Sequence, residues 1–484
     1  MNKKELTTFV LKEWFKNSSD IVIITKSYKG SGSFHSLTFL YCPNIVNTNM
    51  INETILPKIT EVMEKEQRFT IERLNSFLGI TELKVDGPIK NEIEKKLFSG
   101  ELVIFNEDSK DVYFISVSNP PKRSPEESSL ETSVRGPRDG FVENISDNMA
   151  LIRQRLKSSS LKSIEYTIGE RSKTKILLLF IEDILNPSIL EEVQKRLGSL
   201  KIDILNSSNQ LEEMLYDRTY SIFPLMDYIG RPDFVVDSLN QGRFAILVEG
   251  SPSCLLGPTS VNQLSYSPED SNTSFFYISF VRILRILALF TTIFLPGFFI
   301  ALITFQTDQL PYTLLATISM SRVGLPLSSP MEEFIMLTLF ELFKEAGLRL
   351  PKAVGQTVAV LGGLIIGDAA IRAGLTSPAM LVIISITVIS GYTLVNQNIG
   401  GNIVILRYFV LFLSSIFGMY GFFISLFTII TLVFSLESFG QPYVPHFFHP
   451  NLPEILKAYL RFPYKQLKKR NQAYQPEDRS RQKE

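Results

Sequence analysis

Three long stretches in the second half of the chain carry no charged side chain, and they constrain the fold more than any other feature. They run over Ile286–Thr307, Ala373–Leu406 and Tyr408–Leu436. An α-helix needs about 20 predominantly apolar residues to cross the roughly 30 Å hydrocarbon core of a bilayer. Runs of this length therefore predict membrane-spanning helices in the part of the chain that follows Phe275.

The part before Phe275 has the composition of an ordinary soluble protein, which the averages of 45% hydrophobic residues and a mean hydropathy of +0.13 conceal. The formal net charge of +0 does not indicate a nucleic-acid partner. The N-terminal segment MNKKELTTFVLKEWFKNSSD lacks a long apolar core, so we expect no cleavable signal peptide. Cys42 and Cys254 both lie in this part, and they suit a reducing compartment better than a disulfide framework.

Strand and helix patterns divide this part into two subdomains, 1–119 and 138–275. In the first, DIVIITKSY and SLTFLYCP predict a strand pair, followed by a helix and a second pair, GELVIFN and DVYFISVS. The second repeats this order with SIEYTIG, KILLLFIEDI, GRFAILVEG and SCLLGPT. The segment 120–137, rich in proline, serine and charge, is typical of a linker. We predict a soluble N-terminal region of two tandem α+β or α/β subdomains, either duplicated or unrelated, followed by an all-α polytopic membrane domain.

The membrane domain is predicted over 276–440, with four spans at 286–307, 355–371, 378–394 and 408–436. The segment 331–349 is amphipathic, so we expect it to lie in the interface, or to re-enter the membrane buried against protein, rather than to span. The tail, 441–484, is rich in proline and then basic. The positive-inside rule places both termini in the cytoplasm, whereas a fifth span would place the basic tail outside. Arg407 falls on the outer side in this scheme.

A series of motifs between about Leu130 and Pro445 is specific as a set. In the soluble part it comprises GPRDGFVENISDNMALIRQRL, DILNSSNQLEEML, SIFPLMDYIGRPD and GRFAILVEGSPSCLLGPT. In the membrane part it comprises FVRILRILA, LPGFFIA, EFIMLTLFELFKEAGLRLP, VLGGLIIGDAAIRAGLTSP and SFGQPYVP. With these motifs the chain resembles the A subunit of the spore germinant receptor (GerA) family. It departs from the family's pattern at Ile229–Gly230, where relatives more often have Thr-Glu, and at Glu249, where they often have Asp.

This resemblance implies a multi-pass protein of the spore inner membrane. It implies two partners, a transporter-like B subunit that binds the nutrient and a lipoprotein C subunit. It further implies a homo-oligomeric, pentameric ring that forms a nutrient-gated ion channel and triggers germination. Two alternatives stay open. One is a non-conducting scaffold that transduces the signal of the B subunit, and the other is a transporter that binds solute at a broken helix near Pro296 or Gly400–Gly401.

The helix predicted over Gly355–Arg372 gathers small residues on one half of its surface. Close packing of the GxxxG kind, as in Gly363–Gly367, explains such a face. With the resemblance, the same face is a candidate pore wall that gates by dewetting. The candidate pore-lining and gate residues are Gln356, Ala359, Val360, Gly363 and Gly367. At the inner end, Asp368 and Arg372 form either a charged pore mouth or a local salt bridge worth about 0.3–0.5 kcal/mol.

Two other groups of charged residues are candidates for contacts with other subunits or partners. The first group, on the segment 331–349, consists of Glu333, Glu341 and Glu345. The second group, where the linker meets the second subdomain, consists of Arg135, Arg138 and Asp139. The alternative for both groups is an ordinary solvated surface.

No pattern indicates catalysis, a cofactor or a metal. His446 and His449 have no cysteine or acidic cluster beside them to complete a metal site. The chain has no Walker loop and no GxGxxG after a predicted strand. We therefore expect a protein that is not an enzyme and that holds no cofactor or metal.

Overall fold

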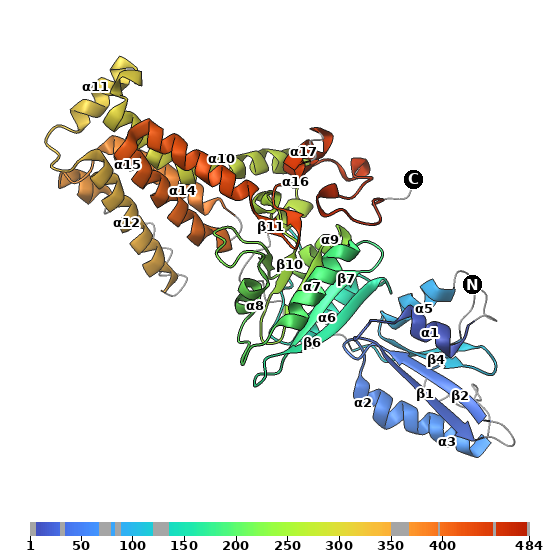
Figure 1. Cartoon of the computed structure of the whole chain (residues 1–484). Coiled ribbons are helices and arrows are strands. Elements are labelled where there is room, and N and C mark those ends of the chain that lie inside the picture. The colour runs from blue at the N-terminus through green and yellow to red at the C-terminus, as the bar shows by residue number, and fades with distance from the viewer. Residues whose placement is uncertain are drawn as a thin grey trace.

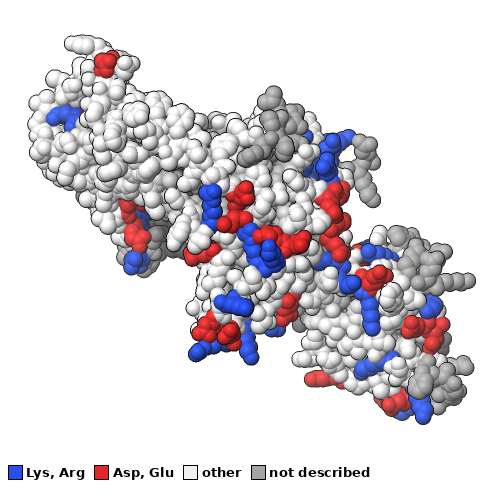
Figure 2. Space-filling view, viewed as in Figure 1, with Lys and Arg blue, Asp and Glu red and all other residues white. Residues whose placement is uncertain are grey.

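The computed structural model describes residues 6–29, 34–66, 79–82, 89–119, 135–349, 367–394, 397–448 and 452–481. Two sheet subdomains and a region of long helices follow one another in space as they do in the sequence (Figure 1). On the face shown in Figure 2, charged side chains gather over the subdomains and the tail and are sparse over the helical region. The predicted division into a soluble part and a helical part is therefore visible in the surface chemistry.

The first subdomain is built on a five-stranded antiparallel sheet in the order β1-β2-β4-β5-β3. Its strands are β1 (Val22–Lys29), β2 (Phe34–Tyr41), β3 (Thr81–Glu82), β4 (Glu101–Asn106) and β5 (Val112–Ser116). Because alternate side chains of a strand point to opposite faces, β4 sends Leu102 and Ile104 into one core and Val103 and Phe105 into another. The first core is closed by a π-helical turn (Ile51–Ile55), which follows the short α2 (Thr48–Met50), and by α3 (Leu56–Glu66), and the second by α1 (Thr8–Trp14) and α5 (Ile89–Leu97).

The second subdomain repeats this topology in a sheet of the order β6-β7-β9-β10-β8, again antiparallel throughout. Its strands are β6 (Leu161–Ile168), β7 (Thr174–Ile181), β8 (Asp227–Ile229), β9 (Phe244–Val248) and β10 (Cys254–Gly257). One face is covered by α7 (Pro187–Ser199) and α8 (Ser208–Leu215), the other by α6 (Ile145–Arg155) and α9 (Pro232–Asn240). The predicted pair of tandem subdomains is confirmed, and their shared strand order supports a duplication.

The helical region contains α10 (Phe275–Phe305), α11 (Tyr312–Ser321), α12 (Ser329–Leu348), α14 (Pro378–Tyr392) and α15 (Gln397–Phe434). Among the described residues, two helical stretches, Phe275–Phe305 and Gly400–Phe434, are long and apolar enough to cross a membrane. The predicted span at 355–371 falls mostly outside the described residues, which resume at 367 in helical conformation.

α15 is divided at Gly418 into two helical arms, so the run predicted as a single span over 408–436 is not one continuous helix. Gly418 has a φ of 61° and a ψ of −137°, values that no helix contains. The chain reverses there. The evidence is the close approach of Gly421 to Leu413, whose carbonyl oxygen a Cβ on Gly421 would overlap. These two residues would lie about 12 Å apart in a straight helix. The apolar run could not reveal the reversal, since glycine is common inside continuous membrane helices as well.

α10 begins at Phe275, well before the boundary predicted at 286. Arg282 and Arg285 marked that boundary in the sequence, but both guanidinium groups pair with Asp270, at 3.0 Å each. The helix continues through both arginines, and the single carboxylate of Asp270 offsets part of their positive charge.

The tail returns to the second subdomain after α15. Val261 N–H donates to Tyr443 O at 2.9 Å, and Ser438 Oγ donates to Leu225 O at 2.7 Å. Two short helices, α16 (Pro445–Phe448) and α17 (Leu452–Tyr459), follow beside the start of α10. The beginning of α10 and the end of α15 therefore lie on the same side of the helical region, next to the second subdomain (Figure 1).

Candidate functional site

A cluster of ionisable side chains is buried between the long helices, and α12 supplies most of it. Glu333 precedes Met336 and Leu337 by three and four positions, so all three share one helix face. That face packs into an apolar core with Ile300 of α10 and Met380 of α14. Glu332 and Glu333 are both 0% exposed as a result. Of the two arrangements that the sequence left open for this segment, the packing supports a helix buried against protein.

Hydrogen bonds to Glu332 link the start of α12 to the start of α14. Its Oε1 accepts hydrogen bonds from Thr376 Oγ1 at 2.9 Å and from Ser377 N–H at 2.5 Å. Arg322 lies 3.8 Å from the other carboxylate oxygen. Ser377 also caps α14 by accepting from Met380 N–H at 3.3 Å. Glu332 thus has a structural role at the end of the helices far from the subdomains.

Glu333 is different, because neither of its carboxylate oxygens has a hydrogen-bond donor among the described residues. Glu332 is its immediate neighbour, and Arg407 is the cation that acts on it. An ionisable group inside a membrane domain is costly, faces the interior of the bundle, and marks a functional site by default. Glu333 therefore lies inside the bundle, rather than on the outward contact surface expected from the sequence.

Arg407, on the first arm of α15, is the buried cation of the cluster and is only 3% exposed. Its Nη1 lies 3.2 Å from Glu341 Oε1. Its Nε donates to Thr292 O at 3.0 Å. In a regular helix that carbonyl oxygen would accept from the N–H of residue 296, but Pro296 has none. Pro296 therefore leaves an acceptor open inside α10, and Arg407 fills it.

A cavity of about 20 Å³ adjoins this ion pair and has room for about one water molecule. Thr292, Glu341, Lys344, Tyr392 and Arg407 are among the residues that line it. Lys344 Nζ lies 3.6 Å from the second oxygen of Glu341. Glu341 is thus shared between two cations, so each ion pair can weaken while the other strengthens.

The remaining charged candidates lie on the surface. Glu345 pairs with Arg349 at 2.8 Å, and Asp368 pairs with Arg372 at 2.8 Å; all four side chains are more than half exposed. Gly367 is buried against Leu381 of α14. The other pore-lining candidates, Gln356, Ala359, Val360 and Gly363, lie outside the described residues.

The candidates at the start of the second subdomain make contacts within the chain. Arg135 N–H donates to Glu269 Oε2 at 3.3 Å, and Asp139 pairs with Arg155 at 2.5 Å. Arg138 is exposed. Gly136, between them, fits closely, because a Cβ there would lie 2.5 Å from both Arg231 Nη2 and Asn272 Nδ2. The segment is held against the subdomain, with Arg135 and Arg138 on its exposed side.

Sequence reasoning missed Arg407 and Thr292. Arg407 was assigned to a loop on the outer side, because it separates two charge-free runs. A basic residue in an outer loop conflicts with the positive-inside rule. The place of Arg407 inside the bundle removes this conflict, because the rule counts only residues in loops. The sequence does contain one indication of this contact. Pro296 has no N–H, so the Thr292 carbonyl oxygen lacks its usual donor in the helix.

No metal or thiol chemistry stands out. Across the described ranges, no three His, Cys, Asp or Glu side chains gather closely enough to hold a metal ion. His446 is buried, and His449 lies outside those ranges. Cys42 and Cys254 are free and buried. Burial raises the pKa of the Cys42 thiol to about 12 and also raises that of Cys254, so neither is a reactive thiolate near neutral pH.

Known proteins are similar to this chain along nearly its whole length. The chain matches the Bacillus/Clostridium GerA spore germination protein family over residues 10–473. It is 40% identical to spore germination protein XA of Bacillus anthracis, over 99% of this chain and 97% of that protein. It is 33% identical to spore germination protein B1 of Bacillus subtilis, over 98% of this chain and 97% of that protein. It is 32% identical to the uncharacterized membrane protein YfkQ of Bacillus subtilis, over 90% of this chain and 85% of that protein.

One solved structure is also similar, the N-terminal domain of the A subunit of the Bacillus megaterium spore germinant receptor GerK3. The match has 24% sequence identity and a TM-score of 0.39, and it covers 52% of this chain and 92% of that chain.

Proposed function

The chain belongs to the Bacillus/Clostridium GerA spore germination protein family, and on this premise we propose that it forms the ion-conducting part of a nutrient-gated receptor. As a member of this family it is a membrane protein and the A subunit of a spore germination receptor, and it is not an enzyme. The proposal concerns what the A subunit does when the receptor responds to a nutrient. It opens an ion pathway, and the ion flux starts germination.

The observation that carries this proposal is the buried cluster of Glu333, Glu341 and Arg407. A scaffold needs helices that pack through apolar and small side chains, and charged groups inside the bundle would only destabilise it. Here Arg407 pairs with Glu341, and Glu333, buried on the same helix as Glu341, lacks a hydrogen-bond donor in the described structure. Such a cluster can exchange partners, so it supports a gating element better than a fixed joint.

In the proposed assembly, copies of the A subunit form a ring, and each contributes the helix predicted over Gly355–Arg372 to the pore. The described residues on either side support a crossing by this segment. Ser377 is bonded to Glu332 at the start of α12, whereas Lys344, near the end of α12, lies beside Leu394. The described flanks of this segment, Leu348 and Gly367, therefore lie towards opposite ends of the bundle. Gln356, Ala359, Val360, Gly363 and Gly367 would line this pore, and Asp368 with Arg372 would stand at its mouth.

We place both termini in the cytoplasm and the helices in the spore inner membrane. The contacts between the tail and the second subdomain support an even number of crossings, because they bring the start of α10 and the end of α15 together. The proposed units are 1–119, 138–275 and 276–440, with a linker over 120–137 and a tail over 441–484. The exposed Arg135 and Arg138, Asp139, and Glu345 remain proposed contacts with neighbouring A subunits or with the B and C subunits.

The test is ion flux from liposomes that contain the purified complex of A, B and C subunits, measured with and without the nutrient. Glu333→Gln keeps the shape of the side chain and removes its charge, and we expect it to change nutrient-triggered flux at least tenfold. Glu437→Gln is the control, because its carboxylate is exposed just after α15 and belongs to none of the proposed contacts. Gly363→Leu tests the pore wall, and we expect it to alter flux in the open state.

The outcomes separate the two functions that the sequence leaves open. If the wild-type complex responds to nutrient without any ion flux, the chain is a scaffold that transduces the signal. If Glu333→Gln leaves the flux as unchanged as the control Glu437→Gln does, the buried cluster has no part in gating.

A further inference from the structure

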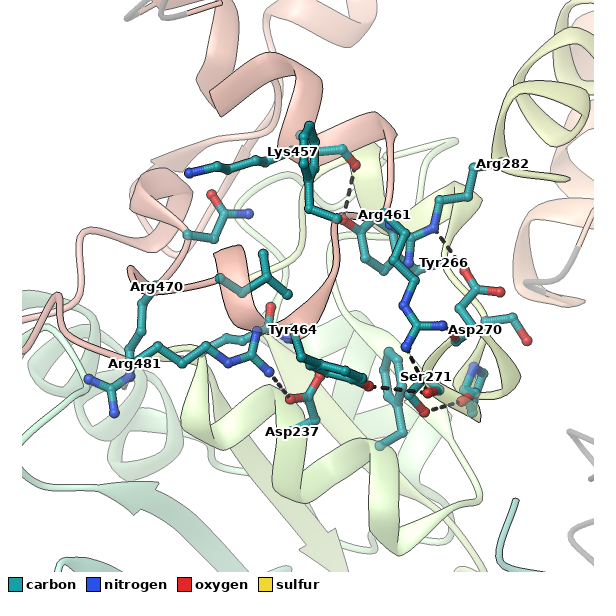
Figure 3. Close-up of a pocket in the computed structure, with 18 of the residues that line it drawn as sticks. Asp237, Tyr266, Asp270, Ser271, Arg282, Lys457, Arg461, Tyr464, Arg470 and Arg481 are labelled. Atoms are coloured by element: carbon teal, nitrogen blue, oxygen red, sulfur yellow. Dashed lines mark hydrogen bonds and ion pairs between the residues drawn. The ribbon is translucent and has the colours of Figure 1, made fainter. Parts of the chain in front are cut away.

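A second charged site lies where the second subdomain, α10 and the tail meet. It is a pocket of about 460 Å³, bordered by the short helix η4 (Pro268–Asn272), by α9, by the start of α10 and by α17. Figure 3 shows Arg282, Tyr266 and Asp270 on one side of it and the tail residues Arg470 and Arg481 on the other.

Paired charges build the walls of this pocket. Arg282 pairs with Asp270 at 3.0 Å and lies over the ring of Tyr266, 3.8 Å from its centre. Arg461 donates to the carbonyl oxygens of η4, including Ser271 O at 2.8 Å. Arg481 pairs with Asp237 at 3.0 Å. These groups are occupied by partners in the chain and give the pocket its shape.

The lining as a whole is nevertheless strongly positive. It contains six lysine or arginine side chains and three aspartates. Lys457 and Lys469 are both exposed, and no carboxylate of the described residues forms an ion pair with either ammonium group. The structure therefore leaves two cations at the pocket for an anion from outside the chain.

The height of the pocket relative to the membrane identifies the kind of anion. Arg461 N–H donates to Ser279 Oγ at 3.1 Å. Ser279 precedes the charge-free run that begins at Ile286 by about 10 Å along α10. The headgroup region of a bilayer is roughly 5–8 Å thick on each side. The pocket thus lies at headgroup level or just outside it.

Exposed aromatic residues mark the same level. Phe276, Tyr277 and Phe280, on the first turns of α10, are 76%, 59% and 58% exposed. On α17, Leu456 is 48% exposed and directly precedes Lys457. Aromatic side chains gather at membrane interfaces, and lysines beside them attract anionic lipids.

We propose that this pocket binds the headgroup of an anionic phospholipid, with Lys457 and Lys469 on its phosphate. The bound lipid adds a further link between the tail, the start of α10 and the second subdomain, which already contact one another through Arg461 and Arg481. This inference requires that α10 enters a membrane and does not depend on ion conduction by the subunit.

The test uses the full chain in a neutral detergent, and microscale thermophoresis measures its affinity for dioctanoyl phosphatidylglycerol. Each lysine near an anionic surface is worth about 1 kcal/mol. We therefore expect Lys457→Gln combined with Lys469→Gln to raise Kd about 30-fold, which corresponds to about 2 kcal/mol. Lys201→Gln combined with Lys465→Gln removes two exposed lysines that do not line the pocket, and we expect it to leave Kd unchanged.

Two further probes distinguish the source of the anion. Dioctanoyl phosphatidylcholine carries a phosphate without net charge, and we expect at least tenfold weaker binding. Inorganic phosphate at the same concentration should not compete. Equal binding of phosphatidylcholine, full competition by inorganic phosphate, or an unchanged Kd in the Lys457 and Lys469 variant would each overturn the proposal.

Discussion

Two buried arginines have very different hydrogen-bond partners. Arg153 lies in the soluble part, and Arg407 lies among the long helices. Arg153 is 0% exposed, and each of its three nitrogens donates a hydrogen bond. Two of these bonds reach the carboxylate of Asp20, at 2.8 Å and 2.9 Å. Others reach the carbonyl oxygens of Ser158 and Leu161. The pair joins the two subdomains, because Asp20 belongs to the first and Arg153 to the second.

Arg407 is nearly as buried but has a looser set of partners. Its closest carboxylate oxygen, Oε1 of Glu341, is 3.2 Å away, and the other oxygen of that carboxylate lies 3.6 Å from Lys344. A second carboxyl group, Glu333, is buried nearby without a donor. A charged group whose donors are all hydrogen-bonded holds its surroundings in one arrangement, because any movement breaks several bonds at once. A charge with incomplete partners in apolar surroundings can exchange them at little further loss, as a gate requires.

Breaking the Arg153–Asp20 pair should have the largest effect on stability. Arg153→Met leaves Asp20 buried without its cation, and the loss of a partner from a buried ion pair destabilises by about 3–5 kcal/mol. The single tryptophan of the chain, Trp14, lies at this interface, because Lys162 Nζ donates to its carbonyl oxygen at 3.1 Å. Tryptophan fluorescence during urea unfolding of the full chain in detergent therefore reports on this pair.

Arg171→Met is the matched control for Arg153→Met. Arg171 pairs with Asp203 at 2.8 Å, but the two side chains are 79% and 60% exposed. Exposed ion pairs contribute about 0–1 kcal/mol, so the urea midpoint should move little. Equal shifts in the two variants would refute the idea that Arg153 fastens the subdomains.

Glu212 sharpens the comparison, because it is an incompletely bonded carboxyl group within the soluble part. One oxygen lies 2.5 Å from Tyr216 Oη, and the other has no donor among the described residues. Burial raises the pKa of Glu212 to about 7. The native state therefore keeps a proton that the unfolded chain releases above about pH 4.3, so stability falls as pH rises from there to about 7 and is level above that value.

Replacing Glu212 by glutamine should remove this pH dependence. The variant keeps a group that can hydrogen-bond to Tyr216 and never ionises, so we expect it to be about 3 kcal/mol more stable than wild type at pH 8. Thermal unfolding of the full chain, followed by circular dichroism at pH 5 and pH 8, measures the difference. Glu213→Gln, on the exposed side of α8, should retain the wild-type slope. A wild-type slope in Glu212→Gln would show that the carboxyl group is ionised in the native state.

Much of the soluble fold could be predicted, because its signals are local. Strand pairs such as DIVIITKSY with SLTFLYCP alternate in the way that a sheet between two cores requires. The reversal at Gly418 could not be predicted, since it depends on the contact of Gly421 with Leu413 and not on the hydropathy of the run. The charge-free apolar run alone predicts a single span where the structure has the two arms of α15.

The candidate site was predictable only in part. The charged segment 331–349 was recognised, but its charges were all assigned to the outside. The helical period does place Glu333 beside Met336 and Leu337, so its burial could have been derived. For Arg407, Pro296 marks the open acceptor, Thr292 O, but nothing in the sequence shows that an arginine more than 100 residues later reaches it.

The surface pair Asp368–Arg372 offers the finest test of the comparison, because it is a fully paired charge in the helical region. The side chains are 60% and 79% exposed and lie at i, i+4 spacing, so Asp368→Asn should cost only about 0.3–0.5 kcal/mol of stability. A place at the pore mouth adds a second expectation. Asp368→Asn should shift the reversal potential across liposomes in a salt gradient towards anions, and Arg372→Gln should shift it towards cations, because a charge at a mouth concentrates ions of the opposite sign. Shifts of the same sign, or no shift in either variant, would reduce the pair to an ordinary surface salt bridge and leave the buried cluster around Arg407 as the charged element of the gate.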